Sequence, residues 1–69
     1  MQDETRLQIA ERLIRQAEMH VVRQQQMIEK LRRRNRSTDD DEKLLHIFTE
    51  TLRVHQRDLE ALSLEVQTP

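Results

Sequence analysis

The sequence predicts an all-α protein: an antiparallel two-helix hairpin of the coiled-coil type, completed as a four-helix bundle by homodimerisation. The first observation is composition. The 69 residues include no glycine and a single proline, Pro69, and 36% of them are charged. Such a composition favours long helices. The second observation is that apolar residues recur at heptad spacing in both halves, and the third is that a short polar segment separates the halves.

The first half predicts a helix from about residue 3 to about residue 34. Apolar or small residues recur there at alternating steps of three and four, which are the a and d positions of a heptad. They are Leu7, Ala10, Ile14, Ala17, Val21, Ile28 and Leu31, and Gln24 fills the one remaining position. These residues share one face of the predicted helix.

The segment RRRNRSTDDDE, residues 32 to 42, predicts the reversal of the chain, with the turn at 35–37. Lys30 and the arginines that follow it lie where positive charge complements the carboxyl end of a helix. Asn35 tolerates the left-handed conformation that often ends a helix. The charged segment therefore has a structural role in a hairpin.

The second half predicts a helix from about residue 38 to about residue 66. Ser37 or Thr38 can cap its amino end, and the acidic run at 39–42 suits the first turn. The heptad pattern continues at Leu45, Phe48, Leu52, His55, Leu59, Leu62 and Val66.

The two heptad patterns predict a register for the hairpin, because both helices rise by the same step per residue. The predicted layers are Leu31 with Leu45, Ile28 with Phe48, Gln24 with Leu52, Val21 with His55, Ala17 with Leu59, Ile14 with Leu62, and Ala10 with Val66. Arg32 would pair with Glu42 on one flank. A polar core layer would fix the register, with His20 bonded to Asp58 and His55 bonded to Gln24.

A second apolar stripe predicts self-association, because a lone hairpin of this size buries little surface. Its members lie outside the heptad core on one flank: Leu13, Met27, Leu44, Ile47, Thr51 and Val54. A second copy of the chain is the simplest partner, and an unidentified protein is the other candidate.

The sequence favours no enzymatic activity, no cofactor and no metal. It has no cysteine and no glycine-rich phosphate loop. His20 and His55, with Asp58 as a third ligand, would form a zinc site only if the polar layer did not use them.

Nucleic acid is the alternative partner, through candidate phosphate contacts at Arg32, Arg33, Arg34 and Arg36. Acidic residues follow these arginines at once, and the formal net charge of the chain is −1. Phe48, the one aromatic residue, belongs to the predicted core and is not free for base stacking. These features disfavour nucleic acid relative to a protein partner.

No apolar run approaches the roughly 18 residues that span a bilayer, and the N-terminus lacks the basic and apolar regions of a signal peptide. We therefore expect no membrane partner and a cytoplasmic location.

The pattern resembles a family of small uncharacterised helical-hairpin proteins frequent in alphaproteobacteria. The resemblance covers roughly residues 11 to 59. It rests on the residues Glu11, Arg12, Ile14, Ala17, His20, Val21, Gln24, Ile28 and Leu31, and on Thr38, Glu42, Leu44, Leu45, Phe48, Glu50, Thr51, Leu52 and His55. Asn35 stands where the family has a turn glycine, and the family's turn is less basic. The resemblance implies the hairpin fold and supplies no activity.

The predicted architecture is also similar to the Rop-type helical-hairpin dimer, whose RNA-contacting face has no residue-level match here. The function that the sequence favours is a small, non-enzymatic protein-protein interaction or regulatory module acting as a homo-oligomer. An RNA-binding regulator that uses the arginine-rich turn is the alternative.

Overall fold

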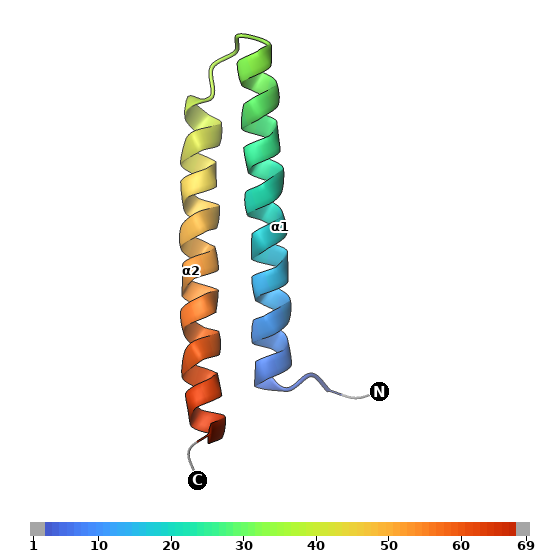
Figure 1. Ribbon diagram of the computed structural model, residues 1–69, viewed down its shortest axis with the longest axis vertical. Helices are drawn as coiled ribbons and strands as arrows, with labels where there is room; N and C mark the ends of the chain where they lie inside the picture. Colours follow the sequence, from blue (N-terminus) through green and yellow to red (C-terminus); the bar gives the residue numbers. More distant parts are fainter. Residues whose placement is uncertain (1–2, 68–69) are drawn as a thin grey trace.

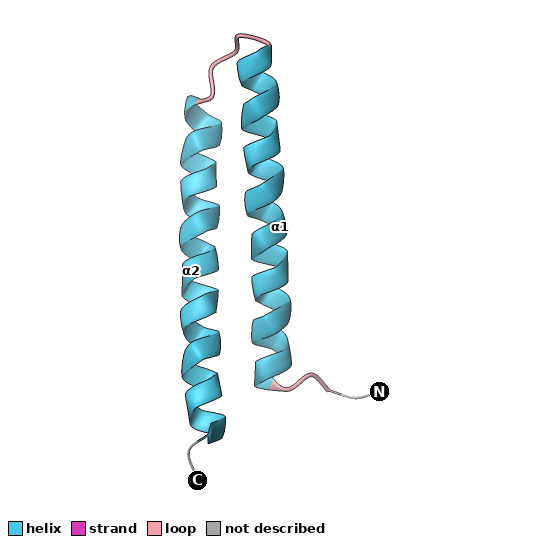
Figure 2. Cartoon of the chain, in the orientation of Figure 1, coloured by secondary structure: helices cyan, strands magenta, loops and turns pink. Residues whose placement is uncertain are grey.

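A computed structural model describes residues 3–67, which contain two helices, α1 (Arg6–Arg33) and α2 (Asp39–Gln67). The helices lie side by side, run in opposite directions and are joined by residues 34–38 (Figure 1). The described residues include no strand (Figure 2). The predicted all-α hairpin of packed helices is confirmed.

A capping box starts α1. The Oγ1 atom of Thr5 accepts a hydrogen bond of 3.1 Å from the backbone N–H of Gln8. In return, the Gln8 Oε1 atom accepts one of 2.9 Å from the backbone N–H of Thr5. Two amide groups that have no partner within the helix are thereby satisfied. The helix begins at Arg6 for this reason, slightly later than the predicted start.

A left-handed residue ends α1. Asn35 has a φ of 54°, and its N–H donates to the carbonyl of Arg32 at 3.1 Å. The N–H of Arg36 donates to the carbonyl of Leu31 at 2.9 Å. This pair of bonds is the Schellman motif, which satisfies carbonyls at the end of a helix. The prediction for Asn35 is confirmed.

Thr38 and Ser37 share the start of α2. The Thr38 carbonyl accepts the first helical hydrogen bond, 2.8 Å long, from the N–H of Glu42. The Ser37 Oγ atom accepts a longer bond of 3.4 Å from the N–H of Asp39. The acidic run at 39–42 occupies the first turn as predicted, where negative charge is stabilised by the helix dipole.

The predicted register of the two helices is wrong by one heptad. Gln24 donates from its Nε2 atom to the Asp41 Oδ1 atom at 2.9 Å and to the Asp41 carbonyl at 3.2 Å. The rings of His20 and Phe48 lie 5.2 Å apart. The predicted layer of Gln24 with Leu52 is therefore not formed.

The length of the connection explains this correction. The Schellman turn reverses the chain within residues 34–38, so Leu31 of α1 comes level with Thr38. The predicted layer of Leu31 with Leu45 would require about seven more residues in the connection. Thr38, which directly precedes α2, and Asp41 within it therefore occupy the first heptad core positions after the turn, and the apolar pattern alone passes over them because they are polar.

The resulting core is narrow. Among the described residues the buried side chains are Ala10, Ala17, Ile28 and Gln24. Val66, which the predicted register packed against Ala10, is 70% exposed. The turn that sets Leu31 level with Thr38 also brings Ala17 level with Leu52 and Ala10 level with Leu59, so a small residue faces a large one in both layers.

The left-handed residue yields a stability prediction. Asn35→Ala should lower the free energy of unfolding by about 1 kcal/mol, because a β-carbon disfavours this conformation and alanine lacks the local hydrogen bonding of asparagine. Asn35→Gly should leave stability unchanged or raise it. Urea unfolding followed by circular dichroism at one protein concentration measures both. Equal stability of the alanine and glycine variants would contradict the role assigned to the positive φ angle.

Candidate interaction surface

A stripe of apolar side chains remains uncovered along one side of the hairpin. Ile47 is 57% exposed, Val54 50%, Met27 47% and Leu44 39%. All belong to the predicted self-association surface, whose remaining members are the half-buried Leu13 and the exposed Thr51. The six residues occupy heptad positions g and c, which flank the same side of an antiparallel helix pair.

A shallow groove confirms that the two helices share this side. Ile9 and Leu13 of α1 line it together with His55, Asp58 and Leu62 of α2. Ile9 is 38% exposed and lies at a c position, like Ile47 and Val54. Ile9 is absent from the predicted self-association surface, although its heptad position is the signal that identifies it. We call Ile9, Leu13, Met27, Leu44, Ile47, Thr51 and Val54 the apolar face.

The opposite side of the hairpin is polar and carries both signs of charge. The groove there is lined by Gln25, Glu29, Arg32 and Glu42, with Ile28 and Leu45 beneath. Arg32 Nη2 lies 2.9 Å from Glu42 Oε1, so the predicted flanking ion pair is confirmed. The hairpin therefore has one apolar side and one charged side.

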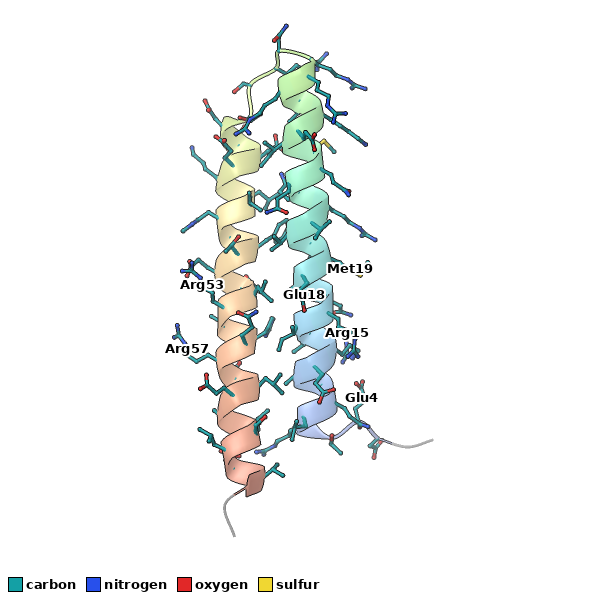
Figure 3. All side chains as sticks on the ribbon, viewed as in Figure 1. Glu4, Arg15, Glu18, Met19, Arg53 and Arg57 are labelled. Carbon is teal, nitrogen blue, oxygen red and sulfur yellow. The ribbon has the colours of Figure 1, made fainter. Side chains whose placement is uncertain are left out.

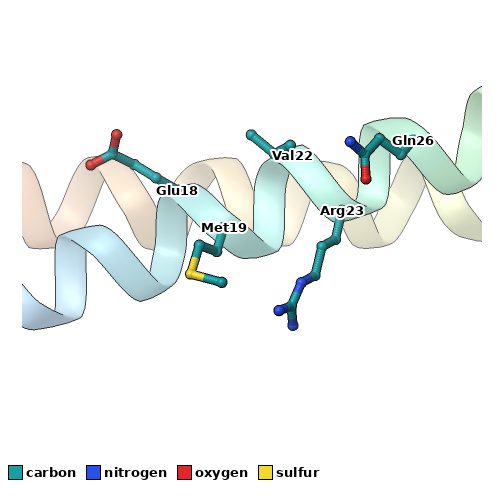
Figure 4. Close-up of a pocket in the computed structure, with 5 residues that line it drawn as sticks. All are labelled: Glu18, Met19, Val22, Arg23 and Gln26. Carbon is teal, nitrogen blue, oxygen red and sulfur yellow. The ribbon is translucent and has the colours of Figure 1, made fainter.

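Exposed apolar residues also lie apart from the apolar face: Leu64 and Val66 near the end of α2, and Met19 and Val22 on α1. Met19 is 51% exposed and Val22 is 50% exposed, and Glu18, Arg23 and Gln26 surround them (Figure 4). Met19 projects from α1 on the side away from α2, as Arg53 and Arg57 project from the far side of α2 (Figure 3). Exposed apolar residues that stand in such small groups are common on soluble proteins.

The predicted polar core layer does not form as a unit. Gln24 is buried, but its hydrogen bonds go to Asp41 and not to His55. His20 is exposed and lies against the Phe48 ring, and Asp58 is exposed as well. The shift of one heptad in the register separates the residues that were predicted to bond.

The structure also bears on metal and membrane binding. Among the described residues, no group of three or more His, Asp or Glu side chains is arranged to hold a metal ion. Neither described helix combines the length and the apolar character that crossing a bilayer requires.

Half of the arginine cluster is neutralised by acidic neighbours. Arg32 pairs with Glu42, and Arg33 Nη2 lies 2.6 Å from Glu29 Oε1. The exposed side chains of Arg34 and Arg36 form no ion pair with other described residues. The cluster thus offers fewer unpaired cations than its sequence indicates, and nucleic-acid binding stays a prediction.

Comparisons of this chain with protein-family models, with curated proteins and with solved structures give no match. The resemblances to the alphaproteobacterial hairpins and to the Rop-type dimer accordingly stay predictions.

The hydrogen bond between Gln24 and Asp41 predicts an energetic coupling between the two helices. A double-mutant cycle of Gln24→Ala and Asp41→Ala should give an interaction energy of about 0.5–2 kcal/mol, because the bond joins a buried amide to a carboxylate. The matched cycle of Gln24→Ala with Asp40→Ala should give an interaction energy near zero. Urea unfolding supplies the four stabilities for each cycle, and equal coupling in the two cycles would contradict the observed register.

Proposed function

We propose that this protein is a non-enzymatic protein-protein interaction or regulatory module that works as a homo-oligomeric helical bundle. The observation that carries the proposal is the apolar face, a set of exposed or half-buried apolar residues on one side of a hairpin whose other side is polar. The proposed occupant of that face is a second copy of the chain, which completes a four-helix bundle.

The surface area supports association. A compact protein of 8.4 kDa is expected to expose about 4,600 Å², whereas this rod of 56 × 26 × 13 Å exposes 6017 Å². The excess of about 1,400 Å² exceeds the ~800 Å² that each partner covers in a standard interface. A dimer that covers the apolar face would bring the exposed area close to that of a compact fold.

The hydroxyl group of Thr51, on the apolar face, also suits burial. The Thr51 hydroxyl donates to the carbonyl of Ile47 at 2.9 Å, so its hydrogen-bonding need is met within α2. Covering Thr51 therefore leaves no hydroxyl donor unpaired, and its methyl group adds to the apolar contact. The charged residues of the opposite side would stay in water in such a dimer, so association would not have to desolvate them.

A dimer of this kind would keep its outer surfaces for other proteins. The backs of both helices carry exposed charges such as Arg15, Arg53 and Arg57 (Figure 3). The turn adds Arg34 and Arg36 at the end of the rod. Regulation by such a module would act through recognition on these helix surfaces.

Two matched substitutions test the proposal. Ile47→Glu with Val54→Glu should shift a dimer to monomer and lower the midpoint of thermal unfolding, because each glutamate would be desolvated at the interface. Met19→Glu with Val22→Glu changes two residues of nearly equal exposure outside the apolar face and should leave the mass in solution unchanged. Light scattering coupled to size exclusion, run over a concentration series, gives the mass of each protein.

Two outcomes would contradict the proposal. One is a native chain that stays a folded monomer at every concentration. The other is an equal loss of mass in both variants, which would mean that the apolar face is not the surface that associates.

A further inference from the structure

The charges around the apolar face are segregated by helix. At the g and c positions of α1 the charged residues are all basic: Arg6, Arg23 and Lys30. At the g and c positions of α2 they are all acidic: Asp40, Asp58 and Glu65. These six residues, the rim charges, stand at the same heptad positions as the apolar residues, so the α1 half of the apolar face carries only positive charge and is its basic edge, and the α2 half carries only negative charge and is its acidic edge. The opposite side of the hairpin mixes both signs on each helix.

These six rim charges are exposed and form no ion pair with other described side chains. The ion pairs among the described side chains are Arg12 with Glu4, Arg32 with Glu42, Arg33 with Glu29 and Arg53 with Glu50. None of them involves a rim charge. The rim is therefore available to meet charges on a second molecule.

Two arrangements with two-fold symmetry stack the apolar faces of two copies. If the axis runs across the helices, each helix lies over its own copy and the two turns lie at opposite ends. If the axis runs along the helices, α1 lies over α2 of the partner and both turns lie at the same end. Neighbouring helices are antiparallel in both cases, so helix dipoles do not distinguish the arrangements.

The rim charges do distinguish them. An axis across the helices sets a basic edge on a basic edge and an acidic edge on an acidic edge. An axis along the helices sets basic on acidic along both edges, at the same levels as within one hairpin. Arg6 lines one groove with Leu62, one helical turn from Glu65, and the turn that sets Leu31 level with Thr38 places Lys30 close to the level of Asp40. Arg6 would then meet the partner's Glu65, and Lys30 the partner's Asp40.

We propose that the second copy docks with the two-fold axis along the hairpin, so that α1 packs on α2 of the partner and both arginine-rich turns lie at one end of the bundle. This arrangement rests on the proposed homo-oligomeric function. It adds the orientation of the partner, which complementary charge selects because like charges across an interface oppose association.

A distance between the two turns tests the orientation. The chain has no cysteine, so Arg36→Cys allows a single spin label at the turn of each copy. Pulsed electron resonance should give a distance of about 20 Å, since neighbouring helices pack about 8–10 Å apart. Turns at opposite ends would give more than 40 Å, because the 28 residues of α1 rise about 42 Å.

The outcomes separate the two proposals. A dimer with the long distance overturns the orientation and leaves the homo-oligomeric function standing. A labelled chain that light scattering shows to be monomeric at every concentration, like the native chain, contradicts both.

Charge reversal supplies an independent readout on the same assembly. Asp40→Lys with Glu65→Lys should raise the dissociation constant of the dimer about tenfold or more, because lysines would then face the basic edge of the partner. Asp39→Lys with Glu60→Lys is the matched control: it changes the same two regions of α2 on the charged side and should change the constant less than about threefold. Adding Arg6→Glu and Lys30→Glu to the first variant should restore affinity. Equal effects of the two pairs, or no recovery in the fourfold variant, would overturn the proposed orientation.

Discussion

The Schellman turn at residues 34–38 determines the arrangement of the rest of the molecule. Two long helices of similar length can slide past each other in steps of one heptad and still match apolar residues. The turn removes that freedom, because Asn35 in the left-handed conformation reverses the chain at once and sets Leu31 level with Thr38. Every later contact between α1 and α2, from Gln24 with Asp41 to His20 with Phe48, follows from that single constraint.

The register in turn explains why one side of the hairpin is left incomplete. With α2 in this position, the buried described side chains are all in α1, and three of the four are small or polar: Ala10, Ala17 and Gln24, with Ile28 as the fourth. Alanines let the helices approach closely but bury little apolar area. The larger apolar residues of α2, such as Ile47 and Val54, lie outside the contact with α1. Stability beyond that of the lone hairpin must therefore come from covering the apolar face.

Sequence pattern was sufficient for the fold and insufficient for the register. Helix composition, heptad spacing and turn chemistry each depend on local sequence, and they placed both helices and the left-handed Asn35. The register depends on which heptad of α2 comes first. Apolar pattern located that start at Leu45 because Thr38 and Asp41 are polar. The length of the connection between the two helices, which the apolar pattern does not encode, sets the observed register instead.

The surface residues also divide into those that heptad position predicts and those that depend on the register. The members of the apolar face were predictable because each lies at a fixed heptad position, and Ile9 follows from the same rule. The polar core layer was not predictable from heptad position. A hydrogen bond requires two particular side chains at the same level, so a wrong register predicts the wrong partners. Gln24 donates to Asp41, for which the sequence predicts only a place in the acidic first turn of α2.

The bond between Gln24 and Asp41 has a consequence for specificity. A leucine at position 24 would enlarge the apolar core and would suit several registers equally, because leucine packs against any apolar layer. A buried amide favours the register that supplies its hydrogen-bonding partner, and sliding α2 by one heptad would break both bonds to Asp41, where a buried amide left without a partner costs about 1–3 kcal/mol. The turn and this bond thus favour the same alignment. That alignment holds the apolar face in one defined shape, with basic residues along α1 and acidic residues along α2. A second copy of the chain can match a surface whose shape and charge pattern are both fixed.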